Sequence, residues 1–413
     1  MQLRILQLNS ARKYIGEAGH TLNLTEALRR RGHAVWLGLR AGYDTFRQAG
    51  RRGLEPVGFH MPHRWWPPQD LPDIRHIARL VRDNRIDVIH AHRGKDHWQA
   101  VLATRLYGLG VPVVRTRHVV TPLSSHAANR WLARRTAALV AVSQAVLDDV
   151  RRAGAYAPER LLLIPAGIDL ELFAPAGAEK QAAARERLLT VAQASRLCVV
   201  AQASSLHVAQ ASSLRTGGTP VLHAGGTPAL QIAVCVARFA VVKAHRVLLA
   251  AWCNVAAQLP GARLLLIGDG QLMADCLELA KAEGLEQSVF FLGRREDVPE
   301  LLDAADVGVL SSVASEGFSR AVLEYMAKGL PVVATRVGAV PDLIEDGVHG
   351  LLVPPNDAGA LAAALLRVLA EPLAQRLAWG RAARAKAERL YGYETWATAH
   401  EELYARLLDR NPS

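Results

Sequence analysis

Short apolar runs alternate with amphipathic segments along most of the chain. LRILQLN predicts a buried strand, IGEAGH a turn, and residues 21–31 a helix that ends at Gly32. Further strands are predicted at AVWLGL, RIDVIHAH, VPVVRTRH, ALVAVS and RLLLIPAGI. Strands separated by helical stretches of about 10–15 residues predict a parallel sheet with helices on both faces.

The second half of the chain repeats this alternation. Strands are predicted at IAVCVARF, ARLLLIGDG, SVFFLG, ADVGVLSS and LPVVAT, with a helix over His245–Gln258 after the first. The segment YETWATAHEELYARLLDR predicts an amphipathic helix with Trp396, Leu403 and Leu407 on one side. Two doubly wound domains in tandem would place a cleft between the carboxyl ends of two sheets.

Residues 190–230 fit neither half. VAQASRLCVVAQASSLHVAQASSL repeats every eight to nine residues, and the near-duplicates TGGTPVL and AGGTPAL follow it. This period is too short for a stacked repeat architecture, and three short copies cannot bury a core. We predict a low-complexity insertion in a connection. Because longer loops add little closure entropy, we expect that excising it leaves a folded, active protein.

Composition indicates a globular protein, with 50% hydrophobic and 21% charged residues among 413. No secretory signal and no apolar run of the roughly 18–20 residues that span a bilayer are found. The four cysteines form no C-x-x-C pair and no metal-ligand spacing with histidine: Cys198, Cys235, Cys253 and Cys276. We therefore expect reduced thiols and a cytoplasmic location.

Positive charge is concentrated in the first half. Through Pro175 there are 26 Lys and Arg against 14 Asp and Glu, whereas the remainder has 23 against 24. An anionic partner is one interpretation, such as a phosphorylated acceptor, an anionic membrane surface or nucleic acid, and a solubilising surface is the other. Trp65 and Trp66 beside Arg64 suit a membrane interface or a packed Pro-rich loop. Nothing else in the sequence supports nucleic-acid binding.

The segment SVASEGFSRAVLEYMAKGLPVVAT carries the candidate chemistry. It predicts a helix over 316–329, capped by Ser315, whose free N–H groups suit an anion or sugar hydroxyls. Glu316 and Glu324 would share one side of this helix about 12 Å apart, and carboxylates bind vicinal hydroxyls well. From spacing alone, two surface glutamates remain the simpler interpretation.

EGFSRAVLE, followed by GLPVVAT and VGAVPD, resembles the signature of retaining family 4 glycosyltransferases (glycosyl transferases group 1). VCVARFAVVKAHRVLLAAW, PGARLLLIGDG and SVFFLGRREDVPELLDAADV resemble further elements of that family, as do RGHAV, DVIHAHRG, VPVVRTRH, AVS and IPAGIDLELF. The resemblance covers nearly the whole chain apart from 190–230. It implies the α/β GT-B fold, in which two Rossmann-like doubly wound domains face a cleft and a C-terminal helix crosses back.

The implied organisation has four parts. Residues 1–172 form an acceptor-binding domain, 173–230 an interdomain segment with the insertion, 231–388 a nucleotide-sugar-binding domain, and 389–413 the crossing helix. The resemblance also assigns roles to individual residues. Those implied to be catalytic are His118, Arg238, Lys243 and Glu316, and those implied to bind the donor are Gly16, Arg238, Lys243, Gly317, Phe318, Ser319, Arg320, Ala321, Val322 and Glu324.

Within these roles, Arg238 and Lys243 bind the diphosphate and replace a metal ion, so neither metal nor cofactor is expected. Glu316 holds the donor sugar, Glu324 the ribose, and His118 faces the sugar near its anomeric carbon. His92 lines the acceptor side or caps its strand.

The chain departs from the family pattern where glycine is usual. Ile15 precedes Gly16, Ala237 precedes Arg238, Ala244 follows Lys243, and GAVPD brings Asp342 where glutamate is typical.

The implied function is retaining, metal-independent transfer from a nucleotide sugar to a glycan or lipid-linked acceptor. The setting would be bacterial cell-envelope polysaccharide or lipopolysaccharide synthesis, peripheral to the inner face of the cytoplasmic membrane. The alternatives are a non-catalytic nucleotide-sugar-binding protein and another GT-B enzyme such as a sugar-nucleotide epimerase.

Overall fold

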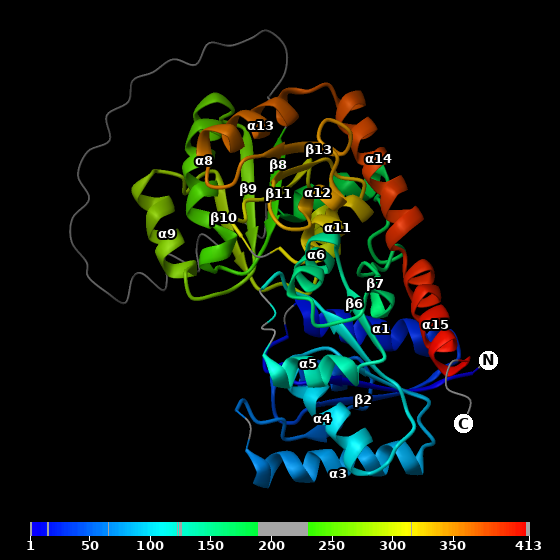
Figure 1. Cartoon of the computed structure of the whole chain (residues 1–413). Coiled ribbons are helices and arrows are strands. Elements are labelled where there is room, and N and C mark those ends of the chain that lie inside the picture. The colour runs from blue at the N-terminus through cyan, green and yellow to red at the C-terminus, as the bar shows by residue number, and fades with distance from the viewer. Residues whose placement is uncertain are drawn as a thin grey trace.

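The computed structural model describes residues 2–14, 16–64, 66–121, 123, 126–188, 230–314 and 316–409. They form two α/β domains, one above the other in Figure 1. The predicted insertion lies outside the described residues except for Leu230, and so do Ile15, Trp65 and Ser315.

The N-terminal domain is built on a seven-stranded parallel sheet in the order β3-β2-β1-β4-β5-β6-β7. Its strands are β1 (Arg4–Asn9), β2 (Ala34–Arg40), β3 (Val57–Phe59), β4 (Val88–Ala91), β5 (Val113–Arg117), β6 (Ala138–Ala141) and β7 (Leu161–Leu163). Its helices are α1 (Gly16–Arg30), α2 (Asp44–Arg51), α3 (Pro67–Asp83), α4 (Gly94–Leu106), α5 (Ala127–Arg134) and α6 (Gln144–Ala153), with a 3-10 turn, η1 (Pro158–Arg160).

The C-terminal domain repeats the arrangement with a six-stranded parallel sheet in the order β10-β9-β8-β11-β12-β13. Its strands are β8 (Gln231–Val236), β9 (Ala262–Ile267), β10 (Val289–Gly293), β11 (Val307–Leu310), β12 (Val332–Thr335) and β13 (Gly350–Val353). Its helices are α8 (His245–Gln258), α9 (Met273–Ala282), α10 (Val298–Asp303), α11 (Arg320–Ala327), α12 (Val340–Leu343), α13 (Ala358–Ala370) and α14 (Leu373–Tyr391), with a 3-10 turn, η2 (Val241–Lys243).

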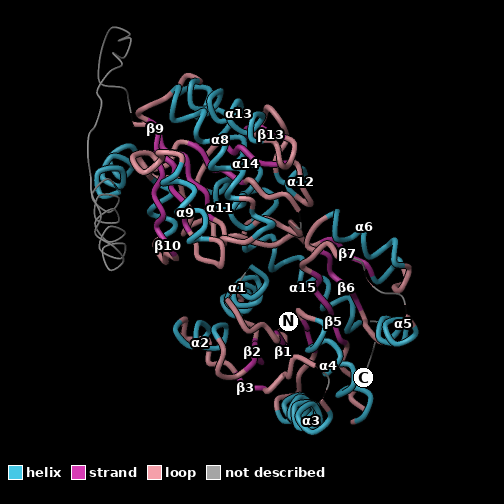
Figure 2. The backbone as a smooth tube through the Cα atoms, turned by 90° about the vertical axis from the view of Figure 1, so that its left-hand side faces the viewer, coloured by secondary structure: helices cyan, strands magenta, loops and turns pink. Residues whose placement is uncertain are grey.

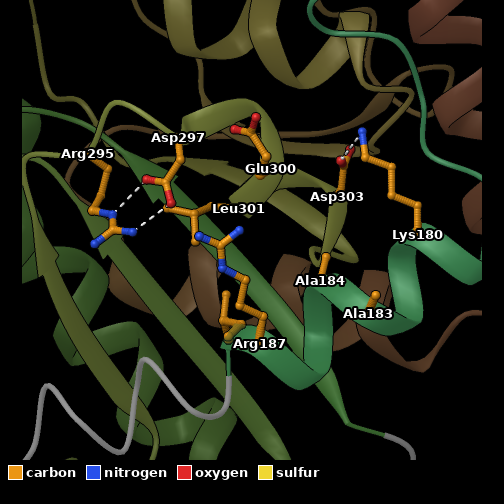
Figure 3. Close-up of a pocket in the computed structure, with 10 residues that line it drawn as sticks. Lys180, Ala183, Ala184, Arg187, Arg295, Asp297, Glu300, Leu301 and Asp303 are labelled. Atoms are coloured by element: carbon orange, nitrogen blue, oxygen red, sulfur yellow. Dashed lines mark hydrogen bonds and ion pairs between the residues drawn. The ribbon is translucent and has the colours of Figure 1, made fainter.

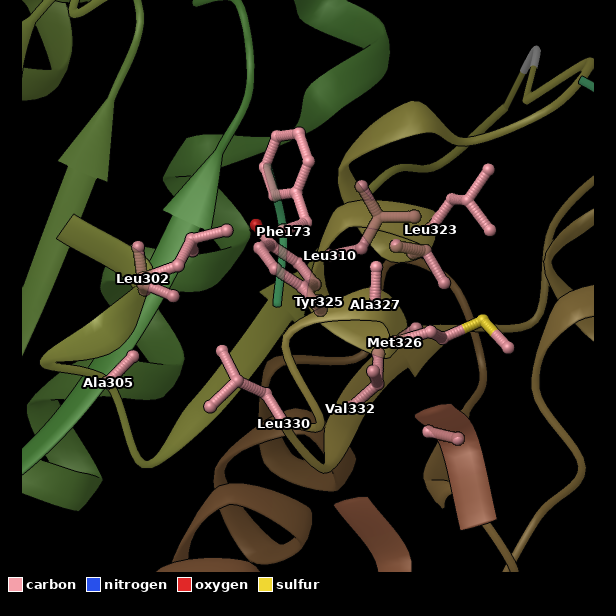
Figure 4. Packing of buried hydrophobic residues seen from close by; sticks show 14 of the residues in the cluster. Phe173, Leu302, Ala305, Leu310, Leu323, Tyr325, Met326, Ala327, Leu330 and Val332 are labelled. Carbon is pink, nitrogen blue, oxygen red and sulfur yellow. The ribbon is translucent and has the colours of Figure 1, made fainter. Parts of the chain in front are cut away.

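The core of the C-terminal domain is organised around Tyr325, a fully buried side chain of α11 (Figure 4). Gly308 of β11 leaves room for this ring, because a Cβ there would lie 2.3 Å from it. The Tyr325 hydroxyl accepts a hydrogen bond from the Val236 N–H at 2.7 Å. Phe173, which follows the last strand of the other domain, packs into the same cluster and ties the connection between the domains to this core.

The chain returns to the N-terminal domain through α15 (Tyr393–Asp409), which packs beside α1 (Figure 1). The crossing point is a backbone bridge between Ile168 and Gly392, where α14 ends. Gly167 allows Trp396 to pack against the chain, since a Cβ there would lie 2.4 Å from the indole. The predicted GT-B architecture with its crossing helix is therefore confirmed.

Two short strands, β3 and β13, were not predicted from the hydrophobic pattern. Helix α1 begins at Gly16, five residues before the predicted start at Thr21. Among the described cysteines, Cys235 and Cys276 are buried and Cys253 is half-buried, and all three are free thiols. Within the described ranges no single helix is long and apolar enough to cross a membrane, and only the bent pair α13 and α14 passes that test when taken together.

Candidate functional site

Each sheet reverses its strand order beside its first strand, between β1 and β4 in one domain and between β8 and β11 in the other. Open α/β sheets bind ligands at the carboxyl ends of strands at such a reversal. The loops after these strands meet across the domain boundary, where α1 lies on the side of its domain that faces the other (Figure 2). The predicted site residues lie on these loops, on helices α1 and α11, and, for His118, directly after β5.

The loop after β8 carries Arg238 and is packed through its backbone against a glycine turn. A Cβ on Gly268 would lie 2.1 Å from the carbonyl oxygen of Ala237, and one on Gly270 would lie 2.3 Å from that of Phe239. Only glycine fits this close approach. Arg238 lies between Ala237 and Phe239, whose backbones are held by these glycines. Its side chain is exposed and has no ion-pair partner among the described residues. Its guanidinium is available to a ligand.

The same loop ends in a left-handed residue. Lys243 closes the 3-10 turn η2, and Ala244 follows with φ 48° and ψ 43° before α8 begins at His245. The left-handed region costs a residue with a Cβ about 1–2 kcal/mol, which explains why glycine is usual here. Ala244, where the sequence departs from the usual glycine, therefore occupies a left-handed position that favours glycine.

Lys243 and Glu316 form an ion pair between the loop after β8 and the loop after β11. The Glu316 carboxylate is 5% exposed and also accepts the Ser312 hydroxyl hydrogen at 2.5 Å. Its backbone is fixed too, because its carbonyl oxygen accepts from the Ala339 N–H at 2.8 Å. A Cβ on Gly338 (φ 51°) would lie 2.0 Å from that oxygen. The turn at 338–339, within the VGAVPD segment, thus holds the Glu316 backbone in place.

The predicted helix start at Glu316 is wrong. Helix α11 begins four residues later, at Arg320, and Ser319 occupies the N-cap position without a side-chain cap bond. Glu316 is therefore in the loop, and Glu316 and Glu324 are not two positions of one helix face. The cause is tertiary, since the Glu316 backbone is held by the 338–339 turn and Gly317 is pressed against the other domain.

Arg320 and Glu324 lie on the first turns of α11 and bond to each other, from Arg320 Nε to Glu324 Oε1 at 2.8 Å. Burial raises the pKa of Glu324, and the Arg320 charge partly opposes this. Arg320 also reaches the N-terminal domain, where a Cβ on Gly19 would lie 2.3 Å from its Nη1. Gly19, which the sequence analysis missed, leaves the space for this guanidinium, whereas nothing lies within 4 Å of a Cβ built on the exposed Gly16.

The remaining predicted residues of α11 and the loop before it differ in position. Gly317 touches the other domain directly, since a Cβ there would lie 2.0 Å from the carbonyl oxygen of His118. The Phe318 side chain packs on Tyr391 and on the apolar residues around α6. Val322 is fully buried in the core and Ala321 is half-buried. These residues support the site by their packing, and any contact that they make with a ligand would come from their backbone groups.

Three histidines converge on the N-terminal side of the cleft, a grouping that the sequence spacing did not predict. His118 follows β5 and its Nε2 lies 3.3 Å from Nδ1 of His92, which follows β4. His20 of α1 packs edge-on against His118, with ring centroids 4.5 Å apart. Burial, with a smaller contribution from Arg115, lowers the pKa of His118 to about 3, so its ring is neutral at pH 7.

His92 does not cap its strand or the following helix. The carboxylate of Asp96 caps α4 instead, by accepting from the N–H groups of His92 and Arg93 at 2.8 and 2.9 Å. The His92 ring is buried and contacts Gln7 and His118. The candidate ligand atoms of His20, His92 and His118 lie within 4.8 Å of one another, close enough to share a metal ion, and the spacing of these histidines along the chain gave no sign of this grouping.

Two cavities lie elsewhere. One of about 190 Å³ lies between the helical segment 178–188 and α10, where Lys180 pairs with Asp303 and Arg295 with Asp297 (Figure 3). It is smaller than the roughly 300–1,000 Å³ of typical ligand pockets. The other, of about 360 Å³, lies between α2 of the N-terminal domain and residues 294–296 of the C-terminal domain.

Comparison with known proteins agrees with this geometry. The family model described as Glycosyl transferases group 1 matches residues 231–371, and the one described as Glycosyltransferase Family 4 matches residues 16–172. A crystal structure of Anabaena Alr3699/HepE in complex with UDP superposes with a TM-score of 0.77 at 21% identity, covering 98% of this chain and 100% of that one.

Two curated relatives extend the comparison. The N-acetyl-alpha-D-glucosaminyl L-malate synthase of Bacillus anthracis is 31% identical over 183 residues, which are 44% of this chain and 47% of that enzyme. The chain thus matches less than half of that relative's length. The UDP-Gal:alpha-D-GlcNAc-diphosphoundecaprenol alpha-1,3-galactosyltransferase of Escherichia coli is 24% identical over 316 residues, 73% of this chain and 70% of that enzyme. With a matching family model on each domain, the chain belongs to the family 4 glycosyltransferases.

Proposed function

We propose that this protein transfers a sugar, with retention and without a metal ion, from a nucleotide sugar to a glycan or lipid-linked acceptor of the bacterial cell envelope. The observation that carries this proposal is the Lys243–Glu316 ion pair at the strand reversal of the C-terminal domain, with the exposed Arg238 on the same loop. The UDP in the Anabaena structure and the undecaprenol-linked substrate named for the Escherichia coli relative support the choice of donor and acceptor.

Donor binding would exchange the partners of this ion pair. The diphosphate carries negative charge that Lys243 and Arg238 can bind through charge-assisted hydrogen bonds. When Lys243 turns to the phosphate, the Glu316 carboxylate is released to accept hydrogen bonds from sugar hydroxyls, while Ser312 still fixes its orientation. The ion pair thus holds two binding groups in place until the donor arrives.

The same cations would lower the barrier to bond cleavage. As the bond between the anomeric carbon and the phosphate oxygen breaks, its electron pair moves to the nucleoside diphosphate. Arg238 and Lys243 stabilise this growing charge, which is the role that a divalent metal has in other transferases. His118 is neutral at pH 7, so it would orient a sugar hydroxyl by hydrogen bonding rather than donate a proton as an acid.

Retention is proposed to proceed on one face of the sugar. A double displacement needs a carboxylate nucleophile, and no carboxylate among the described residues is hydrogen-bonded or ion-paired to His118. The acceptor oxygen would then attack from the side that the phosphate leaves. Its proton would pass to an oxygen of the departing phosphate, which balances the step without a further base.

The acceptor is proposed to bind the N-terminal domain, which carries the positive excess of the sequence. A lipid-linked acceptor presents phosphates at an anionic membrane surface, which attracts such a domain electrostatically. We therefore propose a peripheral position on the inner face of the cytoplasmic membrane. Trp66, which is 56% exposed at the start of α3, would be one contact with that surface.

The proposal is tested by incubating the full chain with a panel of nucleotide sugars and a lipid-linked acceptor mixture, and by determining the anomeric configuration of the product. Lys243→Ala and Glu316→Ala should each lower turnover by about 10²–10³-fold, as for loss of one charge-stabilising group. Lys281→Ala is the matched control, because Lys281 is a half-buried lysine of α9 that pairs with Glu278 of the same helix. Equal turnover in all four proteins, or an inverted product, would contradict the proposal.

The second candidate, a protein that binds nucleotide sugars without transfer, is favoured by the left-handed Ala244 next to Lys243. Its methyl group could hold the loop away from a catalytic position. The same assay separates the candidates, because a non-catalytic protein binds the donor and neither transfers nor hydrolyses it. A sugar-nucleotide epimerase would instead return the donor with one inverted sugar carbon.

A further inference from the structure

The three histidines of the cleft come from three separate elements but present their ring nitrogens to one another. The candidate ligand atoms of His20, His92 and His118 all lie within 4.8 Å of one another. His20 and His92 are buried, whereas His118 is partly exposed on the cleft side. A small cation could therefore reach the cluster from the cleft past His118.

The closest pair of nitrogens has the spacing of two ligands on one metal ion. His92 Nδ1 and His118 Nε2 are 3.3 Å apart. Tetrahedral zinc binds imidazole nitrogen at about 2.0–2.1 Å, which places neighbouring ligand atoms about 3.3–3.4 Å apart. The two rings need almost no movement to bind zinc together.

His92 is already oriented as a metal ligand. Its other ring nitrogen, Nε2, lies 2.6 Å from the amide oxygen of Gln7. Because that oxygen only accepts, the proton resides on Nε2 and the lone pair of Nδ1 points into the cluster. Metal-binding histidines characteristically donate their second ring N–H to such an acceptor.

The ring of His20 is an independent indication of a metal site. It is 6% exposed, and both of its ring nitrogens are buried without a hydrogen-bond partner among the described residues. An unpaired buried polar group costs about 1–3 kcal/mol, which coordination to a metal would remove.

The surrounding charges do not forbid a cation. Arg93 and Arg115 are the cations that face His118, and Arg320, which pairs with Glu324, faces His20. Arg93 is paired with Glu17 at 2.5 Å. The negative charges of Asp96 and Glu17 attract the Arg115 guanidinium. Each arginine therefore has a nearby carboxylate that offsets its charge.

We propose that His20, His92 and His118 form a binding site for Zn²⁺, with three imidazole ligands and a fourth position open to the cleft. The consequence for activity rests on the proposed function, in which His118 faces the donor sugar. Zinc bound to His118 would keep this side chain from contacting the donor sugar and would occupy the space of the sugar. The metal is therefore an inhibitor that competes with the donor.

The site is tested on metal-free full-length protein by titration with Co²⁺, whose tetrahedral complexes absorb strongly in visible light, and with Zn²⁺ by calorimetry. The wild type should bind one equivalent of either ion. His20→Phe keeps an aromatic ring against Trp396 but offers no ligand, and should weaken binding by more than about 100-fold, beyond the 10–100-fold range of outer-shell partners. Gln7→Leu should fall within that range, and the exposed His63→Phe should bind like wild type.

Absence of the tetrahedral cobalt spectrum in the wild type, or equal affinity in His20→Phe, would overturn the site. Competition is tested by repeating a UDP-glucose titration with zinc present, because the sugar of this donor would occupy the space beside His118. UDP-glucose affinity should fall in the wild type and remain unchanged in His20→Phe, and an unchanged affinity in the wild type would overturn the inhibition. The cobalt spectrum is recorded without a donor. The metal site is therefore confirmed or rejected independently of whether the proposed transfer reaction is observed.

Discussion

His245 provides the sharpest prediction of pH-dependent stability. It is the first residue of α8, directly after the loop that carries Lys243, and its ring stacks on Phe239 with centroids 4.0 Å apart. The residue is 3% exposed, and its Nε2 has no partner among the described residues. Burial, with a smaller contribution from the Lys243 charge, lowers the pKa of His245 from 6.5 to about 4.

The sign and size of the effect follow from this shift. Between pH 6.5 and 4 the unfolded chain binds a proton at this ring that the folded protein does not bind. The folded state therefore loses stability as the pH falls below 6.5, and nothing changes above it. The loss from His245 alone amounts to about 2 kcal/mol at pH 5 and about 3 kcal/mol at pH 4.

The test compares urea unfolding of wild type and His245→Leu at pH 7.5 and pH 5, followed by circular dichroism. Leucine fills a similar apolar space but cannot be protonated. On going to pH 5, the wild type should lose about 2 kcal/mol more unfolding free energy than the variant. His63→Leu, at an exposed position, should behave like wild type. An identical pH dependence in His245→Leu and wild type would refute the reasoning.

Three further substitutions test local geometry. Ala244→Gly relieves a left-handed residue and should raise the free energy of unfolding by up to about 1 kcal/mol in urea titrations, so a destabilised variant would contradict the assignment. Gly317→Ala places a Cβ 2.0 Å from the His118 carbonyl oxygen and should cost about 1–3 kcal/mol and weaken donor binding in calorimetry, whereas wild-type values would argue against this contact. Asp44→Asn removes the exposed pairs with Arg294 of the other domain, 3.5 Å away, and with Arg47 of the same helix, and should cost at most about 1 kcal/mol by thermal unfolding. A larger loss would contradict the expectation that these exposed pairs are weak.

The sequence predicted the elements whose signal is local. Helix α8 has the predicted bounds, His245–Gln258, and the strands β1, β2 and β8 to β12 all fall within predicted apolar runs, apart from one residue at the edges of β2 and β8. Buried parallel strands are short, continuous apolar runs, so their pattern suffices. The strand β3 has only three residues, one of them an exposed glycine, and gives too little pattern to detect.

The site was less predictable because tertiary contacts determine it. The start of α11 depends on the turn at 338–339 and on the other domain, neither of which is visible in the residues that follow Glu316. His20, His92 and His118 are far apart in the chain, so no spacing indicates that they meet. The signal that could have found two of them is positional, since a histidine directly after a buried parallel strand lies at the ligand-binding edge of the sheet.

The central claim, that Arg238 and Lys243 bind the diphosphate of a nucleotide donor, is tested most directly by calorimetric titration with nucleoside diphosphates. Each charge-assisted hydrogen bond contributes about 1.5–3 kcal/mol, or roughly 10–150-fold in affinity. The Arg238→Ala and Lys243→Ala variants should therefore each bind the preferred diphosphate at least about tenfold more weakly than wild type and Lys281→Ala. Equal affinity in all four proteins would contradict the account.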